Sequence, residues 1–540
     1  MVLLAPAHSA ANEPTARLSL MTAPRRRLLR SLILLLALIN AALLGTYALK
    51  RATPYGLGLV NDTAAYVAGA EGLLEGRGYS RLSGGGEIRA ITHFPPLYSS
   101  VLAAFGWVGI DLLLSARIIG LALFAATVVL AGLLAYQLTA SLWSAILASG
   151  LVAASDGLLG VYALALSESL FLVLLLVTFL LISRYSLERR DRWLGLAGIC
   201  IALACLTRYT GVALVAAAVL SVVVPLNDPR ARWRAAVVLT LPSIVLVGAW
   251  LTRNILVAGT ATNRVAVWHP LSFEATASGI RNVAGWAMPD TLLAGGPAYS
   301  VLLDVLAWGS LCALILWLVL APGGNRVTSP GGASGRVLAW FVLVYTTFLL
   351  VSVSLFDAST PLDFRLFSPV ALTVIILTGT ALRWTWDSGR LAARLVAATL
   401  AGFLLLTSIQ DALAAVERLE VDGQGFAALG WQHSPAVQAI RDLPEDRWLY
   451  SDRPTAIALL TDRTSYIAPS AIDPATGLAR PAYDDDLNNM RERILRGEAV
   501  LALFKEGEGT DPESLAWLHD LTEDMPILAE FNDATLYGKP

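Results

Sequence analysis

Long apolar stretches recur along most of the chain. A first one spans residues 31–49, and further ones lie at about 115–138, 141–156, 160–182, 193–208, 210–225, 235–252, 299–320, 336–356, 366–382 and 394–410. A helix needs ~20 apolar residues to cross a hydrocarbon core of ~30 Å. Helices are also the structure that satisfies the backbone within lipid. The pattern therefore predicts a bundle of membrane-crossing helices.

One weaker stretch leaves the number of crossings open. Residues 97–114 are apolar but are interrupted by Gly106, Gly109 and Asp111. The predicted total is eleven to thirteen transmembrane helices, depending on how this stretch is counted. Composition agrees with a membrane protein, because 56% of the residues are hydrophobic and only 15% are charged.

Arginine-bearing loops predict the orientation of the bundle. The loops at 184–192, 230–234, 326–336 and 383–394 are expected on the cytoplasmic side by the positive-inside rule. The basic residues at 25–30 place the N-terminus on the same side, after an unstructured leader at residues 1–24. The loops 50–96 and 253–298, and everything after 410, then face away from the cytoplasm. We expect a multi-pass protein of the plasma membrane.

The last part of the chain has a different character. From about residue 433 the sequence is polar and mixed, with strands predicted at 448–452 and 500–504 and helices at 455–460 and 487–496. A hairpin is predicted near 527–537. The prediction is therefore an all-α membrane domain at 25–411, followed by a small extracytoplasmic α/β domain at 412–540.

Charge and cysteine content exclude some classes. The formal net charge is −2 and no basic run follows a groove-sized pattern, so nucleic acid is not an expected partner. The three cysteines lie inside apolar stretches, which argues against a disulfide framework or a thiolate metal site; they are Cys200, Cys205 and Cys312.

The first outer loop carries a carboxylate at the start of a predicted surface helix. Asp62 precedes the stretch 63–75, where small residues alternate with apolar ones. Asp62 has two interpretations, a helix N-cap or a general base that takes a proton from a hydroxyl. The loop ends at His93, ahead of paired prolines; His93 is either an exposed loop residue, a cation near a phosphate or a metal ligand.

Three arginines lie at predicted outer helix ends, namely Arg208, Arg253 and Arg365. Each can extend to the lipid headgroups, but three on one face also suit a phosphate, which arginine binds in a bidentate manner. Glu168 lies within an apolar stretch, where an unpaired charge is costly. We expect it to form an ion pair with an arginine or to line a polar cavity.

Together these residues resemble the GT-C superfamily, in particular its aminoarabinose transferases, rhizobial lipopolysaccharide sugar transferases and protein O-mannosyltransferases. The similarity covers about residues 30–410, with Thr63 and Phe94 as departures from the family pattern. It is carried by Asp62 with Tyr66, His93 to Tyr98, Arg117, Ser167-Glu168, Leu206 to Gly211, Arg253-Asn254 and Asp363 to Arg365 ahead of Pro369.

The resemblance implies an inverting glycosyltransferase. Its donor would be a sugar on a polyprenyl-phosphate carrier, and its acceptor a lipid, a glycan or a protein. Asp62 would be the catalytic base. The remaining residues would bind the donor phosphate (Arg208, Arg253, Arg365 and His93) or line the acceptor cavity (Tyr66, Glu168, Tyr98 and Asp363). No cofactor or metal ligand is predicted, and the resemblance does not decide metal dependence.

Two other classes of function remain open at this stage. A transporter or lipid flippase also has many helices with intramembrane charges, and it predicts inverted halves with matching interrupted helices. No such symmetry is visible in the sequence. The other class is a membrane scaffold whose C-terminal domain binds a ligand, and it would leave Asp62 dispensable.

Overall fold

The computed structural model describes most of the chain. The described residues are 23–82, 86–271, 277, 279, 281–282, 297–320, 332–356, 360–473, 475–505 and 512–540. The predicted leader at 1–24 lies outside them except for the first two residues of the first helix. Most of the predicted outer loop 253–298 lies outside them after residue 271.

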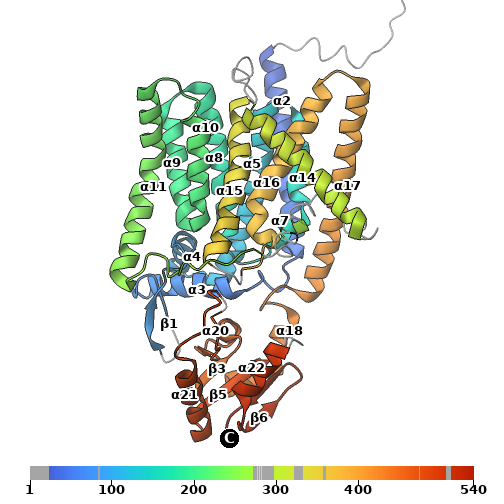
Figure 1. The fold of residues 1–540 in the computed structure, drawn as a ribbon. Helices are drawn as coiled ribbons and strands as arrows, with labels where there is room; N and C mark the ends of the chain where they lie inside the picture. The colour runs from blue at the N-terminus through green and yellow to red at the C-terminus, as the bar shows by residue number, and fades with distance from the viewer. Residues whose placement is uncertain are drawn as a thin grey trace, which may run out of the picture.

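Helices form a bundle that makes up most of the molecule (Figure 1). In chain order they are α2 (Ala23–Arg51), α3 (Asn61–Leu74), α4 (Leu97–Trp107), α5 (Leu112–Thr139), α6 (Leu142–Ala153), α7 (Asp156–Tyr162), α8 (Glu168–Glu188), α9 (Asp191–Thr207), η2 (Tyr209–Gly211), α10 (Val212–Val222), α11 (Pro229–Ala258), α14 (Pro297–Leu320), α15 (Gly332–Phe356), α16 (Phe364–Asp387) and α17 (Leu391–Asp422).

Seven helices within the described ranges are long and apolar enough to cross a membrane: α2, α5, α8, α11, α15, α16 and α17. The pair α6 and α7, bent by 58° at the break between them, makes eight if it is counted as one span. This is fewer than the eleven to thirteen crossings predicted. Several predicted segments are shorter apolar helices, such as the 17 residues of α9 and the 11 of α10, and these are not among the seven. At 1.5 Å per residue, 17 residues cover ~26 Å.

The stretch 97–114 does not form a crossing helix. Helix α4 has 11 residues and ends at Trp107, and a turn with a positive φ at Gly109 leads into α5. Asp111 caps α5 by accepting a hydrogen bond from the amide of Leu114 at 2.8 Å. An 11-residue helix is only ~16 Å long, so this segment belongs to one end of the bundle.

That end of the bundle carries further short elements. Figure 1 shows α3 lying across the bundle end, roughly perpendicular to the long helices. Beside it lies a two-stranded antiparallel ribbon of β1 (Ser80–Leu82) and β2 (Ile88–Ala90). Helix α11 extends to Ala258, so Arg253 lies within its last turns and not in a loop. The predicted surface helix at 63–75 is thus present as α3.

The bundle interior is closely packed and apolar. Helix α16 is the central helix of the bundle, because 83% of the residues in its apolar 18-residue stretch are buried. Phe179 of α8 packs edge-on against Phe341 of α15, with ring centroids 5.4 Å apart. Aromatic pairs of this geometry add stability beyond the area that they bury, so α8, α15 and α16 form a firm support for residues at their ends.

Beyond α3 lies a small α/β domain (Figure 1). Its sheet has the strand order β4-β3-β5-β7-β6, in which β3 is parallel to β4 and β5, and β7 is antiparallel to β5 and β6. The strands are β3 (Trp448–Ser451), β4 (Tyr466–Ile467), β5 (Ala499–Phe504), β6 (Ile527–Glu530) and β7 (Ala534–Tyr537). The helices are α18 (Leu429–Gln432), α19 (Pro435–Asp442), α20 (Pro454–Thr461), α21 (Tyr483–Arg496) and α22 (Pro512–Thr522).

The predicted fold class is therefore confirmed, a helical membrane domain followed by a small α/β domain. The strands at 448–452 and 500–504, the helices at 455–460 and 487–496 and the final hairpin are all present within a residue or a few of their predicted ends. The domain boundary that we placed at residue 412 falls inside α17, which continues to Asp422. The last residues of α17 are polar and mixed in composition, so the change in composition comes before the helix ends.

Candidate functional site

Helix α3 presents two side chains to the end of the bundle. Asp62 is its second residue and Tyr66 follows four residues later, so both lie on one face. The N-cap position is Val60, whose side chain makes no capping hydrogen bond, and the Asp62 carboxylate instead contacts Arg365. The geometry thus gives Asp62 a contact other than helix capping.

Tyr66 anchors α3 to the start of α8. Its hydroxyl lies 2.8 Å from the Ser167 hydroxyl, and only 2% of the residue is exposed. Burial raises the pKa of Tyr66 well above its ordinary value, and the nearby Asp62 charge adds to the shift. Tyr66 therefore stays neutral and serves as a hydrogen-bonding and packing group.

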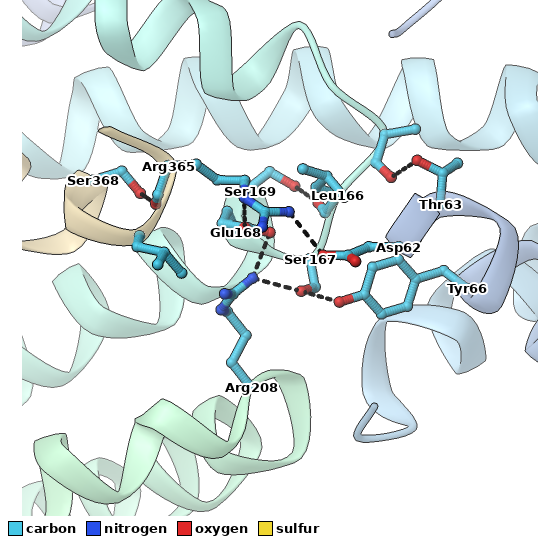
Figure 2. A network of polar contacts seen from close by, with 12 residues as sticks. Asp62, Thr63, Tyr66, Leu166, Ser167, Glu168, Ser169, Arg208, Arg365 and Ser368 are labelled. Atoms are coloured by element: carbon cyan, nitrogen blue, oxygen red, sulfur yellow. Dashed lines mark hydrogen bonds and ion pairs between the residues drawn. The ribbon is translucent and has the colours of Figure 1, made fainter. Parts of the chain in front are cut away.

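Glu168 is the buried centre of the charge network. It is the first residue of α8 and is 2% exposed, with Oε2 lying 2.6 Å from Nη1 of Arg208. Oε1 lies 3.6 Å from Nε of Arg365. Both guanidinium groups point at Glu168 in Figure 2. A buried carboxylate is tolerated because it is paired, and the positive end of the α8 dipole favours it further.

Arg365 connects Glu168 to Asp62. It lies in the first turn of α16, and its Nη1 is 2.7 Å from Oδ2 of Asp62. Asp363 caps the same helix, because its Oδ1 accepts a hydrogen bond from the amide of Leu366 at 3.0 Å. Its Oδ2 lies 3.8 Å from Nε of Arg365. Three helices, α3, α8 and α16, thus bring distant parts of the sequence into one network (Figure 2).

A cavity of about 310 Å³ opens beside this network. Its charged lining consists of one aspartate, Asp62, and three arginines, Arg208, Arg264 and Arg365. His93 also lines it, and its Nε2 lies 3.2 Å from Nη2 of Arg264. One wall is apolar and comes from α15 and its end; it contains Phe348, Leu349, Val353 and Phe356. The cavity therefore joins a cationic polar end to an apolar wall.

Most of the predicted site residues meet here. Asp62, Tyr66, His93, Arg208 and Arg365 line the cavity. The other predicted residues do not line it. Glu168 and Asp363 contact the lining arginines from behind, and Tyr98 is buried against Tyr66 with ring centroids 5.1 Å apart.

Arg253 lies apart from the cavity lining. Its Nη2 donates to the carbonyl of Tyr79 at 3.0 Å, its Nη1 donates to the carbonyl of Ile91 at 3.3 Å, and the guanidinium lies over Trp250. These contacts hold the β1–β2 ribbon against α11. Arg253 therefore supports the β1–β2 ribbon from its place on α11.

Sequence reasoning missed Arg264. It lies after the end of α11, in a segment without regular secondary structure, and it lines the cavity beside His93. Its only sequence signal is that it is an arginine in a predicted outer loop.

We assign no metal site. Among the residues that the structure describes, no group of three or more His, Cys, Asp or Glu side chains is arranged to hold a metal ion.

Comparison with known proteins places this geometry in context. A family model, Dolichyl-phosphate-mannose-protein mannosyltransferase, matches residues 97–257. ArnT from Cupriavidus metallidurans in the apo state is similar in structure, with a TM-score of 0.50 at 13% identity, over 93% of this chain and 97% of that one. The chain has the fold of the GT-C glycosyltransferases. At this identity the structural likeness establishes the GT-C fold, and the chain is a multi-pass membrane protein.

Two further structures share the GT-C fold. The Archaeoglobus fulgidus oligosaccharyltransferase in the apo form gives a TM-score of 0.54 at 13% identity, over 89% of this chain and 71% of that one. The Archaeoglobus fulgidus oligosaccharyltransferase AglB, in complex with an inhibitory peptide and a dolichol-phosphate, gives 0.52 at 12% identity, over 89% and 70%. No curated protein sequence matches the chain significantly.

Proposed function

We propose that this GT-C protein is an inverting glycosyltransferase that moves a sugar from a polyprenyl-phosphate carrier to a lipid, glycan or protein acceptor. The observation that carries the proposal is the placement of Asp62 in a cavity whose other charged side chains are arginines. A carboxylate and several guanidinium groups are what a displacement at a glycosyl phosphate requires, a base for the acceptor and cations for the leaving group.

Asp62 acts as the base in this proposal. The acceptor oxygen attacks the anomeric carbon, and its proton passes to the Asp62 carboxylate. The bond between the anomeric carbon and the phosphate oxygen breaks, and its electron pair leaves with the polyprenyl phosphate. Attack from the face opposite the phosphate inverts the anomeric centre.

The cations of the cavity suit a single phosphate. Arg208, Arg264 and Arg365 line the cavity with three positive charges and Asp62 with one negative charge, while Glu168 and Asp363 contact the arginines from behind. A sugar phosphodiester carries one negative charge, and a second develops on the phosphate as the sugar leaves. Arginines that are already in place stabilise that charge without reorganisation. We therefore propose that the phosphate binds Arg208, Arg365, Arg264 and His93. Arg253 supports the β1–β2 ribbon beside them.

The apolar wall suits the carrier chain. Phe348, Leu349, Val353 and Phe356 lie at the end of α15 that meets the cavity. An isoprenoid chain that follows α15 out of the cavity enters the hydrocarbon layer beside the bundle. A dolichol-phosphate is bound in the AglB structure of the same fold, which supports this kind of donor.

The arginine-bearing loops support an extracytoplasmic site in the plasma membrane. Helix α8 begins beside the cavity at Glu168 and ends at Glu188, ahead of the arginines of 189–192. Helix α16 likewise begins beside the cavity and ends at Asp387, ahead of Arg390 and Arg394. The basic loops therefore lie at the opposite end of the bundle from the cavity, and the positive-inside rule puts that end in the cytoplasm.

Purified full-length protein in lipid nanodiscs tests the activity. We expect it to release polyprenyl phosphate from at least one polyprenyl-monophosphate sugar in a panel that varies the sugar and the prenyl chain, given membrane extract as the acceptor source. The control is the same donor without acceptor. Movement of an intact donor across the bilayer of a liposome, with no release of polyprenyl phosphate, would instead identify a flippase.

A further inference from the structure

The backbone just ahead of α3 is held between two other segments. The amide of Gly58 donates to the carbonyl of Ala163 at 2.7 Å, and the amide of Ala165 donates to the carbonyl of Gly58 at 2.9 Å. On the other side, the amide of Phe426 donates to the carbonyl of Leu59 at 2.7 Å. We call this arrangement the backbone clamp; it consists of residues 58–59, 163–165 and 425–426.

Two glycines allow the clamp to close. A Cβ atom on Gly425 would lie 2.1 Å from the carbonyl oxygen of Leu59, and Gly425 has a φ of +57°. A Cβ atom on Gly58 would lie 2.8 Å from Cβ of Gln424. Both distances are too short for real atoms, and a positive φ favours glycine. A side chain at Gly425 must therefore push residues 58–59 away.

Each segment of the clamp leads directly into the network around Asp62. Leu59 precedes Asp62 by three residues, and Ala165 precedes Glu168 by three residues. The Thr63 hydroxyl ties the two together, because it donates to the carbonyl of Ala165 at 3.1 Å. A shift of residues 58–59 is thus transmitted to the first turn of α3, which carries Asp62.

The third segment leads into the C-terminal domain. Phe426 packs edge-on against Trp431 with ring centroids 5.2 Å apart, and Trp431 lies 4.8 Å from Phe504 at the end of the central strand β5. Leu459 of α20 packs against the buried cluster that contains Tyr66. The C-terminal domain therefore contacts the α3 region at two places, at Leu59 just ahead of the helix and at the buried cluster around Tyr66, and the packed aromatic rings join Phe426 to the sheet of the domain.

We propose that the C-terminal domain is a brace that positions Asp62, and that Gly425 and Leu59 are the positioning residues through which it acts. This inference rests on the proposed role of Asp62 as the base. A base has to lie within hydrogen-bond reach of the hydroxyl that it deprotonates. Tyr66 ties the middle of α3 to Ser167 at the start of α8. The clamp holds the segment that leads into the first turn of α3, which carries Asp62.

Gly425→Ala tests the brace, with Gly430→Ala as the matched control. Gly430 lies in α18 of the same domain, and an added Cβ there would meet nothing within 4 Å. In nanodiscs we expect Gly425→Ala to lower kcat about 100-fold, the cost of a ~1 Å misplacement. The donor KM and the affinity for undecaprenyl phosphate should stay within about twofold, because the arginines are untouched. Gly430→Ala should match the wild type. A folded Gly425→Ala protein with wild-type kcat overturns the proposal.

A compensating pair covers the case in which Gly425→Ala does not fold. We expect Gly58→Ala to lower kcat, because the new methyl group would meet Cβ of Gln424 and Cδ2 of Leu164, each at 2.8 Å. Gln424→Gly in the same chain should restore part of kcat by removing the first of these atoms. Wild-type kcat in a folded Gly58→Ala protein contradicts the brace. If the wild type releases no polyprenyl phosphate, the proposed function fails; if Asp62→Asn keeps full turnover, the base assignment fails; if Asp62→Asn is inactive while Gly425→Ala is fully active, only the brace fails.

Discussion

Nη1 of Arg365 lies 2.7 Å from Oδ2 of Asp62, across 303 residues of sequence. The same guanidinium group also approaches Glu168, with its Nε 3.6 Å from Oε1. Arg365 therefore stands between the proposed base and the buried acid. A donor phosphate that binds Arg365 competes with Asp62 for it, which couples donor binding to the freedom of the Asp62 carboxylate.

Replacing Arg365 should remove the coupling between donor binding and the Asp62 carboxylate. We expect Arg365→Gln to lower kcat/KM at least about 100-fold, since a cation on the leaving phosphate and the partner of Asp62 are lost together. Arg365→Lys should recover only part of the activity, because lysine lacks the planar fork. Arg383→Gln is the control; it lies on the same helix and pairs with Asp387 at the far end. Steady-state release of polyprenyl phosphate measures all three, and equal activity of Arg365→Gln and Arg383→Gln contradicts the assignment.

The pairing of Glu168 with Arg208 predicts a strong energetic coupling. Arg208→Gln leaves a carboxylate that is 2% exposed without its nearer partner. Breaking a buried pair in this way costs about 3–5 kcal/mol. We expect a large drop in the thermal midpoint of Arg208→Gln and a smaller drop in the double variant with Glu168→Gln. Thermal unfolding in detergent of the wild type, Arg208→Gln, Glu168→Gln and the double variant gives the coupling energy between the two side chains. Additive losses would show that the two side chains do not depend on each other.

Arg264 should matter for the donor. We expect Arg264→Gln to raise the donor KM about tenfold, which corresponds to ~1.4 kcal/mol of lost binding. Its effect on kcat should be smaller than that of Arg365→Gln, because the Asp62 contact is intact. Arg81→Gln, an exposed change on β1 at the same end of the bundle, serves as the control. A donor KM that is unchanged in Arg264→Gln places the phosphate elsewhere in the cavity.

The sequence predicted much of the site because its residues obey simple rules. Asp62 stands at the start of a helix, and Arg208 and Arg365 stand at the predicted outer helix ends, so the arginine-bearing loops predict that all three lie on one face. The pairing of Glu168 also follows from its position, since an acidic residue buried in an apolar stretch needs a cation. The structure brings these four together.

The other parts of the site depend on tertiary contacts that leave no pattern in the amino-acid sequence. Arg253 was expected beside the phosphate, but α11 continues past it and its side chain binds the carbonyls of Tyr79 and Ile91. Arg264 lies in an irregular segment. The backbone clamp uses amides and carbonyls of Gly58, Leu59 and Phe426, whose pairing over hundreds of residues cannot be seen in side-chain types.

The difference between the seven or eight candidate spans of the described residues and the eleven to thirteen predicted crossings has a related cause. Apolar runs such as 193–208 and 210–225 are helices of 17 and 11 residues, and hydropathy alone does not show where a helix bends or ends. Crossing requires length as well as apolar character. The break between α6 and α7 at 58° has no proline to mark it.

Asp62→Asn gives the most direct test of the central claim, that Asp62 is the base of a glycosyl transfer. The variant keeps the size of the side chain and removes its capacity to take a proton. Single-turnover release of polyprenyl phosphate in nanodiscs is measured beside Glu71→Gln, a change on the opposite face of α3. We expect turnover of Asp62→Asn to fall by at least about 100-fold with undecaprenyl phosphate binding retained, and Glu71→Gln to match the wild type. Turnover of Asp62→Asn equal to that of the wild type would contradict the account.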